Sequence, residues 1–549
     1  MLAVSPSSTL ISPPLFHLSM KGARTAVLFV LLLLFSSLSL AVLSVNKGDL
    51  KTALNNEESP MEVIVPLGQA NVAGFQEGSI YTNTTLSSSL EMDSHTCAIL
   101  DNGDLKCWGS DVKGQLGDGG SNTNTNAPSS TAIDLGTGRT AVAVSAGDRY
   151  TCAILDNGDL KCWGWDYYGQ LGDGGTNTDT NAPSSTAIDL GTGRTAVAVS
   201  AGSYHTCVIL DNGDLKCWGR DNHGQLGDGG SNTDTNTPSS TAIDLGTGRT
   251  AVAVDAGDYH TCAILDNGDM KCWGYDFKGQ LGDGGSNTNT NAPSSTAIDL
   301  GTGRTAVAVS AGAYHTCAIL DNGDLKCWGW DDYGQLGDGG TNTATNAPSS
   351  TAIDLGTGRT AVAMSTGETH TCAILDNGEA KCWGRDLFGQ LGDGGSNTAT
   401  NAPSSTAIDL GTGRTMAVSE RDLDGDGVLN IFDSTPYTPT TNPSNPLPQR
   451  NVPGFQEGSI FTNQTLASGG SHTCAILDNG SVSCWGLGTT GQIGDETFTS
   501  RNISTPTSSL GAERFAVSTS SGGDFTCVIL DDGSVSCWGF NGNGRLGDG

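Results

Sequence analysis

The chain has 549 residues, of which 78 are glycine and 15% are charged, and 58 acidic against 26 basic residues give a formal net charge of −32. Such a surface repels nucleic acid phosphates and anionic lipid, so neither is expected as a partner. The length predicts two or more domains.

Residues 1–45 have the pattern of a targeting segment. Lys21 and Arg24 precede an apolar run at 26–45. This order is typical of a secretory signal peptide. The alternative is an uncleaved membrane anchor, because the run is nearly long enough to span a bilayer. In either case we expect the bulk of the chain to be secreted or displayed at the cell surface.

A repeat follows the Ser/Thr/Asn-rich lead-in at 46–94. The motif TCAILDNGDLKCWG begins at Thr96 and recurs every 55 residues, so that six near-identical units fill residues 95–419. Two shorter relatives begin at Thr473 and Thr526. A fixed period of this size indicates a solenoid or a propeller.

The motif itself predicts a β-hairpin, because two apolar flanks meet at the Asp-Asn-Gly sequence of residues 101–103. A two-residue turn would set Cys97 opposite Trp108. A three-residue loop with glycine in the left-handed conformation would set Cys97 opposite Cys107. We favour the second register because it gives the hairpin one wholly apolar face.

All 16 cysteines lie in the eight copies of the motif, two per copy. In an oxidising compartment such pairs predict disulfides within each hairpin. A metal site is not expected, because no second pair or His–His spacing accompanies them. The alternative is reduced thiols that pack as small apolar groups. The expected bridges are Cys97–Cys107, Cys152–Cys162, Cys207–Cys217, Cys262–Cys272, Cys317–Cys327, Cys372–Cys382, Cys474–Cys484 and Cys527–Cys537.

Each unit is expected to hold four short strands. In the second unit these are residues 141–145, 151–155, 160–164 and 185–191, with turn-forming residues between the last two. No helical periodicity interrupts them, so the fold class is all-β. Four strands per repeat in six or more repeats predict a β-propeller with six or seven blades.

The pattern G-x-x-H-T-C-A-I-L, then D-N-G-x-L-x-C-W-G, then G-Q-L-G-D-G resembles the regulator of chromosome condensation repeat, over about residues 95–419 and 472–549. This resemblance implies a seven-bladed β-propeller. The first block holds six full repeats, so residues 71–86 and 413–419 are candidates to close the ring or to build another blade. The cysteine pairs resemble those of bacterial and archaeal secreted relatives more than the chromatin-bound eukaryotic member.

The segment at 420–450 begins with RDLDGDGVLNIFD and becomes proline-rich. Its oxygens have the spacing of a Ca²⁺ loop, with glycine at the turn. The prolines exclude the exiting helix of an EF-hand, and the loop is similar to a thrombospondin type 3 calcium repeat. An acidic solvated linker is the alternative, and no organic cofactor is expected. The predicted ligands are Asp422, Asp424, Asp426, the carbonyl of Val428, Asn430 and Asp433.

Residues 451–466 are nearly identical in sequence to residues 71–86. We therefore expect a second domain of the same kind over residues 451–549. Because it contains only two hairpins, this second propeller is expected to be incomplete.

One histidine precedes the Thr-Cys of most motifs, but each copy falls in a different blade. Tyr150 and Phe525 take the same position in two copies, so packing rather than metal binding is expected. No asymmetric cluster of catalytic groups stands out, and the chain is not expected to be an enzyme. The histidines concerned are His95, His205, His260, His315, His370 and His472.

The loops after each Cys-Trp-Gly vary between copies. Their second residue is always aspartate in the six long repeats, whereas the others are often aromatic or basic, as at binding hot spots. Repeat symmetry should gather these loops on one face of the propeller, and neutral drift in exposed loops is the alternative. The predicted binding face comprises Trp165, Tyr167, Tyr168, Arg220, Tyr275, Phe277, Trp330, Tyr333, Arg385 and Phe388.

Together these patterns predict a secreted or surface-tethered propeller that binds an extracellular protein or glycan. The resemblance alone would imply guanine-nucleotide exchange on a GTPase, but the signal segment, the cysteine pairs and the acidic charge argue against it. A polysaccharide-active enzyme is a further alternative without a visible pair of catalytic acids.

Overall fold

The computed structural model describes residues 86–88, 95–100, 103–125, 131–395, 398–410 and, with short gaps, 465–546. These residues form strands, turns and irregular segments and contain no helix, so the predicted all-β class is confirmed for them. None of the described segments is a helix that could span a membrane. The predicted targeting segment at 1–45 and the predicted Ca²⁺ loop at 422–433 lie outside the described residues.

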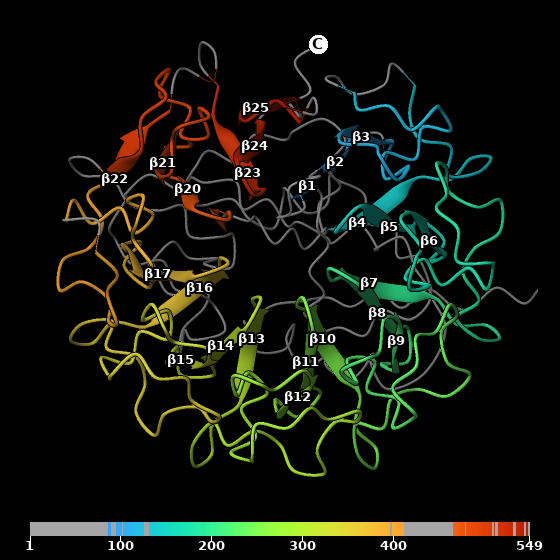
Figure 1. Ribbon diagram of the computed structural model, residues 1–549, viewed down its shortest axis with the longest axis horizontal. Helices are drawn as coiled ribbons and strands as arrows, with labels where there is room; N and C mark the ends of the chain where they lie inside the picture. Colours follow the sequence, from blue (N-terminus) through green and yellow to red (C-terminus); the bar gives the residue numbers. More distant parts are fainter. Residues whose placement is uncertain are drawn as a thin grey trace, which may run out of the picture. The chain divides into compact units, whose positions relative to one another are not determined.

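The strands form a series of small antiparallel sheets, most of them with three strands that follow one another in the chain (Figure 1). The first sheets are β1 (Leu86–Ser88), β2 (His95–Ile99) and β3 (Leu105–Gly109); β4 (Ala141–Gly147), β5 (Tyr150–Leu155) and β6 (Leu160–Gly164); and β7 (Ala196–Ala201), β8 (His205–Leu210) and β9 (Leu215–Gly219).

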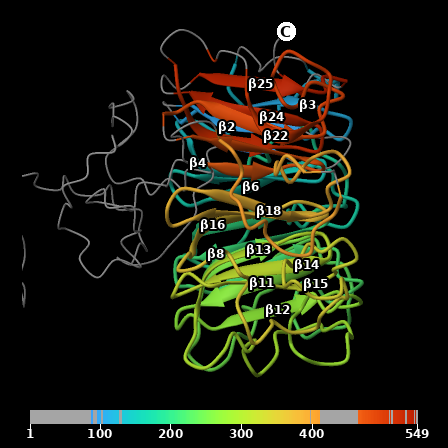
Figure 2. The same cartoon turned by 90° about the vertical axis from the view of Figure 1, so that its left-hand side faces the viewer.

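The middle sheets repeat this order, and Figure 2 shows them from the side. They are β10 (Ala251–Ala256), β11 (His260–Leu265) and β12 (Met270–Gly274); β13 (Ala306–Ala311), β14 (His315–Leu320) and β15 (Leu325–Gly329); and β16 (Ala361–Thr366), β17 (His370–Leu375) and β18 (Ala380–Gly384).

Two further sheets end the described chain. They are β19 (Leu466–Ser468), β20 (His472–Ile476), β21 (Val482–Gly486) and β22 (Arg501–Pro506), which make the one four-stranded sheet of the described residues, and β23 (Ala516–Ser521), β24 (Phe525–Leu530) and β25 (Val535–Gly539).

The hairpin register follows the three-residue loop. Cys97 pairs directly with Cys107, and the turn glycine Gly103 has a φ of 80°, which glycine adopts without steric cost. All eight predicted disulfides are formed, each between cysteines ten positions apart. This part of the sequence prediction is confirmed.

The predicted fourth strand at 185–191 is wrong. One isolated bridge joins Gly164 to Thr180, and the backbone N–H of Ile188 donates to Leu160. Pro183 has no N–H to give to a ladder, and the side chain of Asp189 accepts from Gly191 two residues on. The segment therefore turns, although its apolar side chains are buried.

The core lies between successive sheets. Cys152, Ile154 and Leu160 of one sheet pack with Leu210 and Trp218 of the next. Each sheet therefore covers the apolar face of its neighbour, which explains why one repeat needs the next to bury its core.

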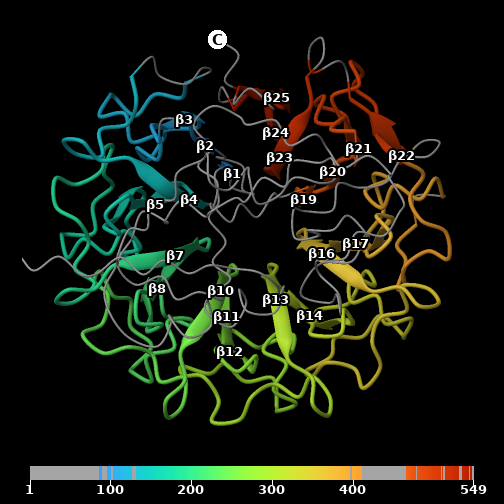
Figure 3. The same cartoon turned by 180° about the vertical axis from the view of Figure 1, so that it is seen from behind.

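The two last sheets continue this series, in contrast to the predicted second domain at 451–549. Ala475 and Trp485 pack with Ile374 of β17. At the other end, Phe525 packs with Trp108 of the first sheet. The motif copies after the long intervening segment thus use the same sheet-to-sheet contacts as the first six, and β23–β25 meet β1–β3, as Figures 1 and 3 show.

Candidate binding face

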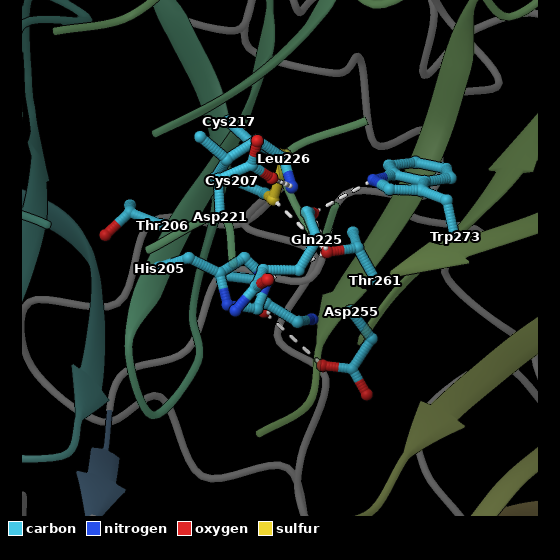
Figure 4. The surroundings of a disulfide bond; sticks show 12 residues. His205, Thr206, Cys207, Cys217, Asp221, Gln225, Leu226, Asp255, Thr261 and Trp273 are labelled. Carbon is cyan, nitrogen blue, oxygen red and sulfur yellow. Dashed lines mark hydrogen bonds between the residues drawn. A yellow bond between two sulfur atoms is a disulfide. The ribbon is translucent and has the colours of Figure 1, made fainter. Parts of the chain in front are cut away.

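Histidine and threonine join neighbouring sheets beneath the candidate face. His205 is buried, and its Nε2 lies 2.8 Å from Oγ1 of Thr261 in the next sheet. Thr261 donates in turn to the backbone oxygen of Gln225, which also accepts from the indole of Trp273 (Figure 4). Because burial lowers the pKa of His205 to about 3, its ring stays neutral.

The same contact recurs in the other sheets that carry histidine, so the predicted packing role is supported. The described residues contain no group of three or more His, Cys, Asp or Glu side chains placed to hold a metal ion. Where Tyr150 replaces histidine, its hydroxyl donates to the backbone oxygen of His205.

The frame of each variable loop is set by its constant residues. Asp166 accepts the backbone N–H of Leu171 at 3.0 Å, and the side chain of Gln170 accepts that of Tyr168 at 2.9 Å. The loop is also tied to the inner turn, because the N–H of Trp165 donates to the carbonyl of Arg149. The side chains of the aspartate and the glutamine thus fix the backbone of the loop. The other side chains of the loop are not needed for this and can differ between repeats.

The aspartates that accept a backbone N–H of the variable loops, which we call the frame aspartates, are buried where a negative charge is unfavourable. Asp166 is 1% exposed, and its second carboxylate oxygen has no hydrogen-bond partner among the described residues. Burial, and then the charges of Asp173 and Asp179, raises the pKa of Asp166 to about 7. The loop frame is therefore most favourable when this carboxyl is protonated.

Three tyrosines that the sequence analysis missed complete the face. Tyr204, Tyr259 and Tyr314 each directly precede a buried histidine, at the end of the sheet where the variable loops also lie. Backbone hydrogen bonds place the two segments together, as from Arg220 to the carbonyl of Tyr204. The sequence does contain a signal for them, because three successive repeats carry tyrosine at the position before the histidine.

These tyrosines and the variable loops form one continuous row of rings, which we call the aromatic belt. Ring centroids lie 5.8 Å apart between Tyr168 and Tyr204, 5.6 Å between Tyr204 and Tyr259, and 5.9 Å between Tyr259 and Tyr314. Tyr314 continues the row to Trp330 at 5.7 Å. The belt comprises Trp165, Tyr167, Tyr168, Tyr204, Tyr259, Tyr275, Phe277, Tyr314, Trp330 and Tyr333.

Cations lie over the belt. The guanidinium of Arg220 is 4.9 Å from the ring centroids of Tyr168 and Tyr204 and 5.8 Å from that of Tyr259. Arg385 lies 5.0 Å from Tyr333. Such contacts hold the guanidinium groups in fixed positions against the rings.

The predicted face residues differ in exposure. Tyr167 and Phe277 are 68% and 66% exposed, whereas the two tryptophans, Trp165 and Trp330, are partly buried among other rings. Phe388 is also partly buried and makes its loop contact through its backbone N–H, without a ring contact to the belt in the described structure. The structure thus brings together the predicted aromatic side chains except that of Phe388.

The belt covers only one arc of the repeats. It extends over the sheets from β4–β6 to β13–β15. Outside this arc the equivalent loop positions hold Ser110 and Val112 after β3, Leu487, Thr489 and Thr490 after β21, and single phenylalanines, Phe388 and Phe540, after β18 and β25, with no ring contact to the belt among the described residues. A scaffold requirement would apply to every repeat, so this asymmetry favours recognition.

Sequence comparison now identifies the repeat. Residues 90–421 match the RCC1-like domain, and residues 464–492 and 516–545 match the regulator of chromosome condensation (RCC1) repeat. The chain belongs to the RCC1 family.

Relatives of this chain include an ultraviolet-B receptor and a ubiquitin ligase. The chain is 28% identical to the ultraviolet-B receptor UVR8 of Arabidopsis thaliana over 417 residues, which cover 75% of this chain and 79% of UVR8. It is 29% identical over 253 residues to the human E3 ubiquitin-protein ligase HERC2, covering 46% of this chain but only 5% of HERC2. The relatives indicate a regulatory or binding role.

Solved RCC1-type structures support the propeller fold. Human WBSCR16 superposes with a TM-score of 0.54 at 19% identity, covering 76% of this chain and 97% of that one. Prp20p of Saccharomyces cerevisiae, described with its binding to Gsp1p and histones, gives 0.54 at 19% identity, with 80% and 93% covered. The predicted β-propeller architecture is therefore supported.

Proposed function

We propose that this RCC1-family protein is a non-enzymatic binding protein, secreted or held at the cell surface, that recognises an extracellular protein or glycan through the aromatic belt. The proposal rests on one observation: the aromatic belt occupies only one arc of a scaffold whose repeats are otherwise nearly identical. Exposed Tyr167 and Phe277 lie on it among rings that already pack against one another. Exposed aromatic groups of this kind mark contact sites on soluble proteins.

Eight disulfides support the extracellular location, since such bonds persist in oxidising compartments. Guanine-nucleotide exchange, which the family resemblance implies, stays the alternative. Within this proposal the eight described sheets are eight blades of one ring, closed where β23–β25 meet β1–β3.

A binding screen tests the proposal. Purified protein is applied to a glycan array and used in pull-downs from its native surroundings, beside a Tyr167→Ala/Phe277→Ala variant and a Phe498→Ala control. Phe498 is 72% exposed but lies outside the belt. We expect the belt variant alone to lose the ligands that the wild type retains. Equal retention by all three proteins would refute the role of the belt.

We also propose that residues 422–433 bind one structural Ca²⁺. Support comes from the spacing of the oxygen-bearing side chains, which suits this hard cation. Calorimetry of the full chain should show one Ca²⁺ site that Asp424→Ala removes. An unchanged Ca²⁺ isotherm in that variant would show that the loop is only an acidic linker.

A further inference from the structure

Arg220 and Arg385 differ from the arginines that recur at one position of the long repeats. In the repeats, Arg194, Arg249 and Arg304 each pair with an aspartate at 3.3 Å. Arg220 and Arg385 form no ion pair with any described residue, although acidic residues outnumber basic ones by 58 to 26. Because aspartates are abundant in this protein, arginines without an acidic partner are candidates to bind a ligand.

The surroundings of Arg220 leave its donors available. Tyr168, Tyr204 and Tyr259 lie within 5.8 Å of the guanidinium carbon, and none of its side-chain N–H groups donates to a described protein acceptor. Rings that cover the faces of a guanidinium leave the N–H groups at its edge. Those groups suit an incoming carboxylate, which binds arginine with two parallel hydrogen bonds.

The combination of ring and cation recurs along the belt. Arg149 lies 5.6 Å from the ring of Trp165, Arg220 lies over the next rings, and Lys278 lies 5.7 Å from Trp330. Asp148 and Asp332 approach Arg149 and Lys278 at 3.7 and 3.9 Å, so those two cations are partly neutralised. Arg220 and Arg385 thus remain as the two positive charges of the belt without an acidic partner among the described residues, each beside ring faces, and they give an otherwise acidic surface local sites for a ligand with flat apolar faces and negative charges.

We propose that the belt binds an acidic polysaccharide, a linear chain of uronic acid residues, whose sugar rings stack on Tyr167 and Phe277 and whose carboxylates pair with Arg220 and Arg385. This inference rests on the proposed binding function of the belt. An acidic peptide supplies carboxylates but not flat apolar faces at regular intervals, so the exposed rings favour the polysaccharide.

Calorimetry of the full chain with oligogalacturonate tests the inference, with the methyl-esterified oligomer as the neutral match and polyglutamate as the acidic peptide. We expect binding of the acidic sugar, weaker binding of its ester, and weakening in added salt. Arg220→Ala should weaken binding about tenfold or more, because a charge-assisted hydrogen bond is lost. Arg220→Lys should restore part of it, and Arg304→Ala, whose partner is Asp321, should match the wild type.

Three results would overturn the inference. They are equal affinity for the ester, binding of polyglutamate in place of the sugar, and no binding of oligogalacturonate at all. The proposed function would survive each of these if the Tyr167→Ala/Phe277→Ala variant still lost ligands in the wider screen. It would fail separately if that variant retained them.

Discussion

His205 and Thr261 are 56 positions apart in the chain, one position more than the length of a repeat, and His205 Nε2 lies 2.8 Å from Thr261 Oγ1 between two neighbouring sheets. The histidine Nε2–H donates to a hydroxyl that itself donates to a backbone carbonyl. Equivalent contacts join His260 to Thr316 and His370 to Thr473. A local motif residue thus fixes how each sheet is placed against the next.

Replacing this histidine should destabilise the fold. His205→Ala leaves a cavity and removes the donor to Thr261, and we expect a loss of roughly 1–3 kcal/mol in the free energy of unfolding. Because the native pKa of about 3 lies below the unfolded value of 6.5, this histidine supports the wild type fully above pH 6.5 and progressively less toward pH 3. Denaturant unfolding between pH 4 and pH 8 measures both effects. An unchanged unfolding midpoint at pH 8 would contradict this role.

For the frame aspartates we expect the opposite pH dependence of the unfolding free energy. The pKa of Asp166 is raised from 3.8 to about 7, so the native state holds a proton that the unfolded chain has released between these values. The contribution of this group to stability therefore falls as pH rises through that window. Asp166→Asn keeps an acceptor for the N–H of Leu171, and it should gain roughly 1–3 kcal/mol over the wild type between pH 5 and pH 8. A pH-independent difference in unfolding free energy would refute the assignment.

We expect the contact between the last and first described sheets to be the weakest joint between neighbouring sheets. Phe525 stands where most other sheets have histidine, and its ring cannot donate a hydrogen bond to Thr96. The indole of Trp108, like those of Trp485 and Trp538, has no acceptor among the described residues. Between the long repeats, as for Trp163, the indole donates to a backbone carbonyl at 3.0 Å. We expect faster amide hydrogen exchange in β1–β3 and β23–β25 than in β7–β12.

A substitution can reproduce this joint elsewhere. His260→Phe should raise exchange in β10–β15 toward the rate of β23–β25, because it removes the 2.8 Å contact with Thr316. Exchange in β1–β3 should stay unchanged. Uniform exchange across all sheets of the wild type would show that the joint is not weaker.

The sequence predicted the hairpins well because their determinants are local. The Asp-Asn-Gly turn and the pairing of Cys97 with Cys107 depend on residues within one motif. The fourth strand was predicted wrongly because Pro183 and the Asp189 side chain interrupt a segment that still buries Ile188 and Leu190.

The face was predicted only in part for a similar reason. The variable loops were visible as differences between repeats, but the contact of Tyr168 with Tyr204 depends on the packing of one sheet on the next. The position of residues 466–539 between β16–β18 and β1–β3 likewise depends on contacts between distant repeats. Neither relationship is encoded within a single motif.

The measurement that tests the account most directly combines affinity and stability in the same proteins. For a ligand found in the screen, Kd and Tm are measured for wild type, Tyr167→Ala, Phe277→Ala and Phe498→Ala. We expect each belt substitution to cost roughly 2 kcal/mol of binding free energy, as at a hot spot, with little change in Tm because both side chains are mostly exposed. Phe498→Ala should match the wild type in both. Loss of affinity in Phe498→Ala as well, or unchanged affinity in both belt variants, would contradict recognition by the aromatic belt.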